Sequence, residues 1–208
     1  MGTRNLIAAV KDGKVKVAQY CQWDGYFTGQ GENIANFIRN VLAEESSSQQ
    51  FRENIDKCIF VDDDFMRAAQ IEAGLNPDEQ YVSFGDPALA RYQDKYPQFN
   101  RSTGADIFYL IQNGTFELRD DFDFGRDSLW CEFAYIINLD NNTLEIYTGF
   151  NTNENLEIPE VYRRWPKDPD SNYCPVKLHT IVTFRELWEN ENYMEELQEA
   201  EYENEGEE

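Results

Sequence analysis

Two β-hairpin patterns constrain the fold of this chain more than any other feature. Residues 6–10 form an apolar run of strand length, Asp12-Gly13 is a typical hairpin turn, and residues 14–20 alternate between apolar and polar side chains. Later in the chain, the apolar run 133–139 is followed by a turn-forming Asp-Asn-Asn and by the alternating segment 143–148. Hairpins pair antiparallel strands, so the pattern favours an α+β protein over one that alternates strands and helices.

Helical periodicity and capping residues predict where the helices lie. We expect helices over residues 32–44, 62–74 and 86–96, a fourth that follows Gly104 and ends at Asn113-Gly114, and a candidate fifth over 184–202. Residues 51–56 are a candidate short helix, 58–61 a candidate short buried strand, 115–118 a candidate strand and 176–183 the last strand. The segment 151–173 is rich in Asn, Pro and charge, which predicts an irregular connection. The predicted fold is α+β, with a mostly antiparallel sheet of five to six strands packed with four to five helices. Residues 1–184 are expected to form one domain and residues 185–208 an acidic C-terminal helix or tail.

The charge balance excludes some partners. The 40 acidic and 18 basic residues give a net charge of −22, so we expect no direct binding of nucleic acid and none of anionic membranes. No apolar run approaches a membrane span and the start lacks a signal-peptide core, which predicts a cytoplasmic protein, or a phage-encoded one in the host cytoplasm. A single histidine, no CxxC pair and no nucleotide-binding motif predict neither a metal site nor a cofactor.

The connection from Gln19 to Gly31 is far more polar and glycine-rich than a turn requires. Asp24 could act as a base, Trp23 could stack on a ligand, and Gly29 and Gly31 could let backbone amides approach it. The alternative is a loop whose glycines serve backbone conformation alone. Both interpretations remain open at this point.

Several strings resemble the signature of a family of uncharacterised proteins from bacteria, phages and fungi. They are Met-Gly-Thr-Arg-Asn-Leu at the start, Lys-Val-Ala-Gln-Tyr-x-Gln-Trp-Asp-Gly-Tyr over 16–26, Gly-Gln-Gly over 29–31, Arg-Ser-Thr-Gly-Ala over 101–105, Asp-Ser-Leu-Trp-Cys-Glu-Phe-Ala-Tyr over 127–135, Glu-x-Tyr-x-Gly-Phe over 145–150 and Pro-Val-Lys-Leu over 175–178. The resemblance implies no known activity. Cys21 stands where the family pattern has Gly, so it is not expected to be a nucleophile.

The N-terminus also resembles the layout of N-terminal-nucleophile hydrolases, in which a freed Thr attacks an amide with its own amine as the base. Thr3 precedes a strand, an Asp-Gly turn and a second strand, as in that sandwich fold. However, removal of Met1 would expose Gly2 rather than Thr3, and the supporting acid of that family falls at Gln19. The hairpin explains the same pattern without catalysis.

Two functional hypotheses follow. The first is a small-molecule or peptide-binding domain with possible amide-hydrolase chemistry, and the alternative is a non-catalytic acidic protein that blocks a basic site on a partner. The candidate catalytic residues are Asp24, Glu132 and Thr3, and the candidate ligand-binding residues are Arg4, Asn5, Gln22, Trp23, Gly29, Gln30, Gly31, Asp127 and Cys131. Convergence of Trp23, Asp24 and Glu132 with Gln30 in one pocket would favour the first hypothesis.

Overall fold

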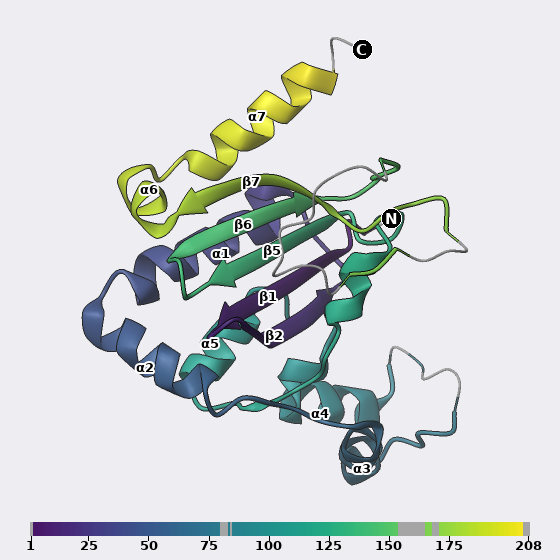
Figure 1. The fold of residues 1–208 in the computed structure, drawn as a ribbon. Helices are drawn as coiled ribbons and strands as arrows, with labels where there is room; N and C mark the ends of the chain where they lie inside the picture. Colours follow the sequence, from purple (N-terminus) through teal and green to yellow (C-terminus); the bar gives the residue numbers. More distant parts are fainter. Residues whose placement is uncertain (1, 80–82, 84, 154–164, 168–170, 206–208) are drawn as a thin grey trace.

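The computed structural model describes residues 2–79, 83, 85–153, 165–167 and 171–205. Its centre is a five-stranded sheet with strand order β2-β1-β5-β6-β7 (Figure 1). The strands are β1 (Asn5–Lys11), β2 (Lys14–Cys21), β5 (Phe133–Asn138), β6 (Thr143–Thr148) and β7 (Lys177–Thr183). The fold class is α+β, as predicted.

Both predicted hairpins are present, and their turns lie side by side. Asp12 and Gly13 have positive φ angles of 53° and 65°, as a two-residue hairpin turn requires. The Asp140 carboxylate in the second hairpin turn accepts hydrogen bonds from the backbone N–H groups of Asp12 and Gly13, at 2.7 and 2.8 Å. The two hairpins are joined by a parallel pairing of β1 with β5, so the sheet is mixed.

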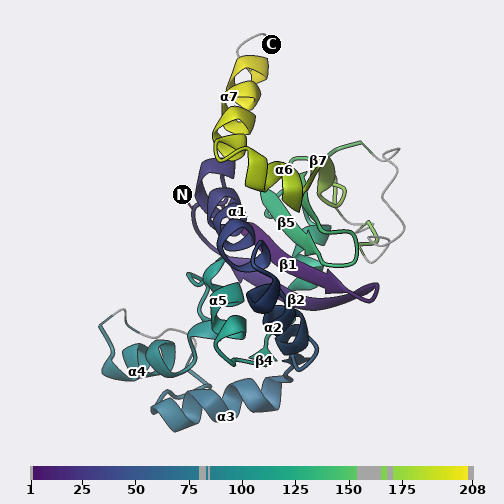
Figure 2. The ribbon, with the colours of Figure 1, turned by 90° about the vertical axis from the view of Figure 1, so that its left-hand side faces the viewer.

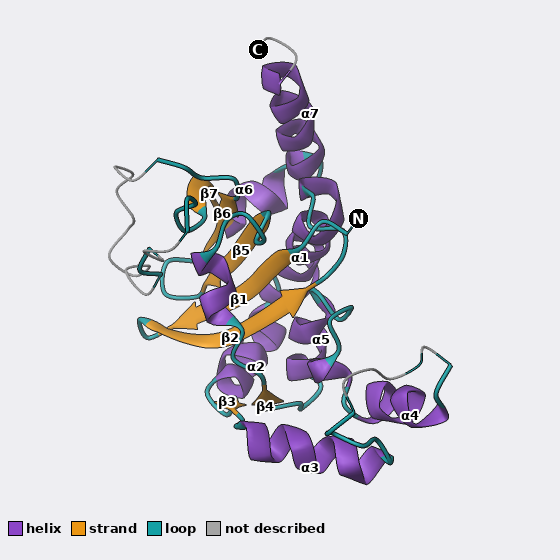
Figure 3. Ribbon diagram, turned by 90° about the vertical axis from the view of Figure 1, so that its right-hand side faces the viewer, coloured by secondary structure: helices purple, strands orange, loops and turns teal. Residues whose placement is uncertain are grey.

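Helices cover one face of the sheet (Figures 2 and 3). A helical segment runs from residue 27 to 42, with a π-helical first part (Phe27–Gly31), α1 (Glu32–Phe37) and a π-helical last part (Ile38–Leu42). It is followed by α2 (Glu45–Ile55), and α5 (Asp106–Gln112), α6 (Phe184–Glu189) and α7 (Tyr193–Glu205) complete this side. The larger hydrophobic core lies between these helices and the sheet, and includes Ile7, Phe37 and Phe108.

A smaller core lies on the opposite face. Trp165 is 1% exposed and packs against Phe122 of the 3-10 helix Phe122–Arg126 and against Tyr147 of β6. Its indole N–H donates to the Phe122 carbonyl at 2.7 Å. The acidic segment 120–127 therefore places Phe122 in a core.

A separate group of elements, called the third unit below, lies under the sheet in Figure 1. It contains α3 (Asp63–Ala73), α4 (Pro87–Lys95) and the 3-10 helix Pro97–Phe99, next to a parallel ladder of β3 (Ile59–Phe60) and β4 (Glu117–Leu118). The predicted caps are confirmed, because the Asp62 and Asp86 carboxylates accept from backbone N–H groups of the first turn. Gly74 ends α3 with a φ of 88°, in the left-handed region that glycine adopts without strain.

The structure refines three local predictions. The helix predicted from residue 32 is present as α1, and a π-helical turn over Phe27–Gly31 precedes it inside the glycine-rich connection. The helix predicted over 51–56 starts earlier, at Glu45, where the Glu44 side chain accepts from the Ser47 N–H. The strand predicted over 58–61 is present at Ile59–Phe60 but lies at the surface, since Ile59 is 58% exposed.

The sandwich form of the fold is unconfirmed, because the only second sheet among the described residues is the two-stranded ladder. Much of the predicted connection 151–173 lies outside the described residues. The described helices include none with the length and apolarity to cross a membrane.

Candidate functional site

The predicted site segments converge at one end of the sheet. In the strand register, Asn5 at the start of β1 stands opposite Cys21 on one side and Phe133 on the other. The residues before β1, after β2 and before β5 therefore meet there. These segments contain the predicted site residues, and most of their side chains bind other parts of the protein.

Asn5 ties the N-terminus to the connection. Its side chain is fully buried, and its Nδ2 donates to the carbonyls of Thr3 and Trp23 at 3.2 and 3.1 Å. The Gly25 N–H also donates to the Thr3 carbonyl, at 3.0 Å. Asn5 therefore positions the chain on both sides of it and is closed to a ligand.

The glycines serve close packing. A Cβ atom on Gly29 would lie 2.2 Å from the backbone oxygen of Asp24, and one on Gly31 would lie 3.1 Å from the Tyr135 ring. The Tyr135 hydroxyl donates to the Gly25 carbonyl at 2.7 Å, which fixes the connection on the sheet. The structural interpretation therefore explains both glycines without a ligand.

The predicted amide ligands are occupied in the same way. Gln30 is 8% exposed, and its Oε1 accepts from the backbone N–H of Ala105 at 2.8 Å. The Gln22 Oε1 accepts from the Tyr20 hydroxyl at 2.6 Å, and its backbone N–H donates to the Arg101 carbonyl at 2.8 Å. These contacts attach the connection to residues 101–105.

Arg4 and Glu132 form a pair at the surface of this end. Nε and Nη2 of Arg4 each lie 3.3 Å from Oε1 of Glu132, and the Arg4 backbone N–H lies 3.2 Å from the same oxygen. The guanidinium group lies 4.5 Å from the ring centre of Trp130, which is 51% exposed. Sequence reasoning missed Trp130, although it stands inside the quoted string 127–135.

The candidate nucleophiles are poorly placed for attack. Cys131 is fully buried and burial raises the pKa of its thiol well above the usual range, so its assignment to ligand binding was wrong. Thr3 is 6% exposed, and a Cβ on Gly2 directly before it would lie 2.4 Å from the Trp23 ring. The Asp127 carboxylate accepts from the Leu129 N–H at 3.1 Å, as a turn-stabilising aspartate does.

One predicted residue does line a cleft. Trp23 is 42% exposed and forms part of a cleft of about 630 Å³ between the connection and the third unit. Asp24, Gln30 and Glu132 are not among its lining residues, so the four test residues share one end of the sheet without sharing this cleft. The other lining residues are Leu89, Tyr92, Gln93, Phe99, Asn100, Arg101, Ser102 and Arg119.

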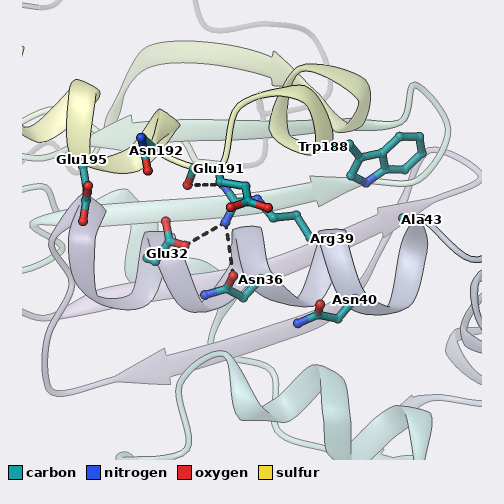
Figure 4. A pocket seen from close by; sticks show the side chains of 9 residues that line it. All are labelled: Glu32, Asn36, Arg39, Asn40, Ala43, Trp188, Glu191, Asn192 and Glu195. Carbon is teal, nitrogen blue, oxygen red and sulfur yellow. Dashed lines mark hydrogen bonds and ion pairs between the residues drawn. The ribbon is translucent and has the colours of Figure 1, made fainter.

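A second cleft, of about 680 Å³, lies between the helical segment and the turn from α6 to α7 (Figure 4). Arg39 crosses it with all five guanidinium N–H groups occupied. Their acceptors are Oε1 of Glu32, Oδ1 of Asn36 and the carbonyls of Leu187, Asn190 and Glu191. Trp188, Asn192 and Glu195 also line this cleft. Because Arg39 has no free donor, we interpret it as a structural clasp.

The described residues include no group of three or more His, Cys, Asp or Glu side chains arranged to hold a metal ion. Comparison with known proteins adds no assignment: no family model matches the chain, and neither a curated protein nor a solved structure matches it.

Proposed function

We propose that this chain is a small-molecule-binding protein and that the Trp23 cleft is its binding site. The observation that carries the proposal is the cleft itself, about 630 Å³ in volume and lined, among the described residues, by three aromatic side chains, one leucine and five polar or charged side chains. Small-molecule sites have volumes of roughly 300–1,000 Å³ and this kind of mixed lining. A half-exposed indole in such a cleft offers a flat surface for a planar ligand.

The packing around Trp23 supports the same proposal. The Trp23 carbonyl accepts from Nδ2 of Asn5 at 3.1 Å and from the Cys21 thiol at 3.3 Å, and Gly2 packs against its ring. These contacts hold the backbone of Trp23 before any ligand arrives, which reduces the entropy lost on binding. The tightly packed connection thus presents the Trp23 indole to the cleft from a fixed backbone position.

Amide hydrolysis stays a prediction without a supporting contact. A free amine at Thr3 would require cleavage after Gly2, so mass spectrometry of the purified protein tests it directly. An N-terminus at Met1 or Gly2 would remove Thr3 as an N-terminal nucleophile.

The alternative of an acidic interaction protein has some support in the distribution of charge. Residues 186–205 contain nine glutamates and no basic residue, and three glutamates line the second cleft. Binding of a basic peptide that is lost in Glu195→Gln and kept in Trp23→Ala would favour this alternative.

Saturation-transfer NMR with a panel of small neutral, anionic and cationic aromatic compounds tests the binding function. We expect at least one compound to bind the full chain, and Trp23→Ala to abolish its signal. Trp188→Ala is the matched control, because Trp188 is also 42% exposed but lines the other cleft. Thermal melting checks that both variants are folded. Equal binding to the two variants would contradict the proposed site.

A further inference from the structure

We infer that the Trp23 cleft binds an aromatic phosphate monoester, with the phosphate at Arg101 and Arg119 and the ring against Trp23. The inference rests on the proposed function and adds the chemical class of the ligand.

The cleft lining has the opposite charge to the chain. The sequence carries 40 acidic and 18 basic residues, yet the nine described residues that line this cleft include two arginines and no carboxylate. The charged residues described in the lining of the second cleft are, by contrast, three glutamates and one arginine: Glu32, Glu191, Glu195 and Arg39. In a chain with a net charge of −22, a cleft whose described lining holds two guanidinium groups is a local site for an anion, and Arg101 carries its unpaired charge because Arg119 also pairs with Asp121 beside the cleft.

The two arginines have donors to offer. The Arg101 side chain is exposed and makes no ion pair or hydrogen bond with another described residue. Nε of Arg119 lies 2.8 Å from Oδ1 of Asp121, and its terminal nitrogens make no bond with the described residues. Both arginines also line a small adjoining cavity of about 30 Å³ beside Asp121, so they lie on the same wall.

The backbone holds Arg101 in place next to Trp23. Its carbonyl accepts from the Gln22 N–H at 2.8 Å, and the neighbouring Ser102 N–H donates to Oδ1 of Asn100 at 2.9 Å. The bond from Gln22 to Arg101 therefore holds Arg101, which offers the charge, close to Trp23, which offers the ring surface. A ligand that spans both meets a preorganised pair.

Tyr92 adds a neutral donor to the same wall. Its side chain is 8% exposed, and its hydroxyl makes no hydrogen bond with the described residues. Burial raises the pKa of the Tyr92 phenol, against the opposing effect of the nearby Arg119, so the hydroxyl keeps its proton near neutral pH. A phosphate oxygen is a suitable acceptor for this hydroxyl and for the guanidinium groups.

A phosphate monoester fits this set better than a polyanion or a neutral ring. Two guanidinium groups match a compact dianion, to which arginine donates in bidentate geometry. The strongly acidic remainder of the chain repels a long polyanion, so nucleic acid stays excluded while one phosphate is accommodated. Trp23, Phe99 and Leu89 supply the apolar surface for the ring.

Calorimetric titration of the full chain with phenyl phosphate and AMP, each against its neutral counterpart phenol or adenosine, tests the inference. We expect each phosphate to bind at least tenfold more tightly than its counterpart, and Arg101→Gln to remove that preference while leaving the neutral compound unaffected. Arg185→Gln is the control, because Arg185 is exposed on α6 and, within the described part of the chain, pairs with Glu189 alone. We also expect the preference to weaken with added salt.

The outcomes separate the two proposals. Equal affinity for charged and neutral compounds, or an unchanged preference in Arg101→Gln, would overturn the inference and leave the binding function standing. If no aromatic compound binds in a manner that depends on Trp23, both proposals fail. Melting curves of Arg101→Gln that match those of the original chain exclude misfolding as the cause.

Discussion

Removal of the Arg39 side chain should destabilise the protein strongly. Arg39 is the clasp that joins the helical segment to the turn between α6 and α7 (Figure 4). Its side chain is 12% exposed, and it donates to two side-chain oxygens and three backbone carbonyls. Arg39→Ala leaves these acceptors without their donor and separates two segments about 150 residues apart in the chain.

The magnitude follows from the partners. The pair of Arg39 with Glu32 has a distance of 2.7 Å, and the Glu32 side chain is 27% exposed, so water replaces part of the lost interaction. Removing one member of a buried pair costs about 3–5 kcal/mol, and we take the lower end, about 3 kcal/mol, because of this partial exposure. For a chain of this size, that loss lowers the melting temperature by roughly 6–12 °C.

Urea unfolding followed by circular dichroism measures this loss. Arg185→Ala is the matched control, because it removes an arginine whose pair with Glu189 is 80% and 63% exposed, and we expect no measurable loss of stability. Arg39→Lys keeps the charge but has fewer donors, so it should fall between the original chain and Arg39→Ala. If Arg39→Ala and Arg185→Ala unfold at the same urea concentration, Arg39 is not a clasp.

Three further predictions concern the connection from Gln19 to Gly31 and two thiols of the chain. Tyr135→Phe should lower the free energy of unfolding by about 1–2 kcal/mol, because the buried Gly25 carbonyl loses its donor; unchanged urea unfolding would contradict this. Gly29→Ala should cost about 1–3 kcal/mol despite the better helix propensity of Ala, since the new Cβ meets the Asp24 oxygen; a stabilised variant would show that the backbone gives way. Burial raises the pKa of the Cys58 thiol to about 12 and raises that of Cys131 still further. An aromatic disulfide reagent at pH 8 should therefore label these two thiols only after urea is added. Rapid labelling of both thiols in the native protein would refute their assignment as inert.

Local signals in the sequence predicted most of the elements correctly. The Asp12-Gly13 turn and the Asp62 and Asp86 caps are recognisable because their hydrogen bonds are made within a few residues. The π-helical start at Phe27 was missed because glycines at 29 and 31 disfavour a helix on propensity alone. Contacts with Asp24 and with the sheet override that propensity.

The site was predicted only in part. The sequence indicated the three segments that meet at the end of the sheet, but it could not distinguish side chains that hold the fold from side chains that face solvent. Asn5 and Gln30 read as ligand groups and are used internally. Arg101 and Arg119, which line the cleft with Trp23, were not predicted because no local pattern relates residues so far apart in the chain.

The sequence by itself determined the hairpins, the caps and the overall negative charge, since each depends on neighbouring residues or on composition alone. Only the tertiary structure decided that β1 pairs with β5, that Arg39 joins the two sides of the second cleft, and that the described lining around Trp23 holds two arginines and no carboxylate. The physical reason is that these features join residues from distant segments. Their energies depend on burial and on distances through space, and a linear pattern carries neither.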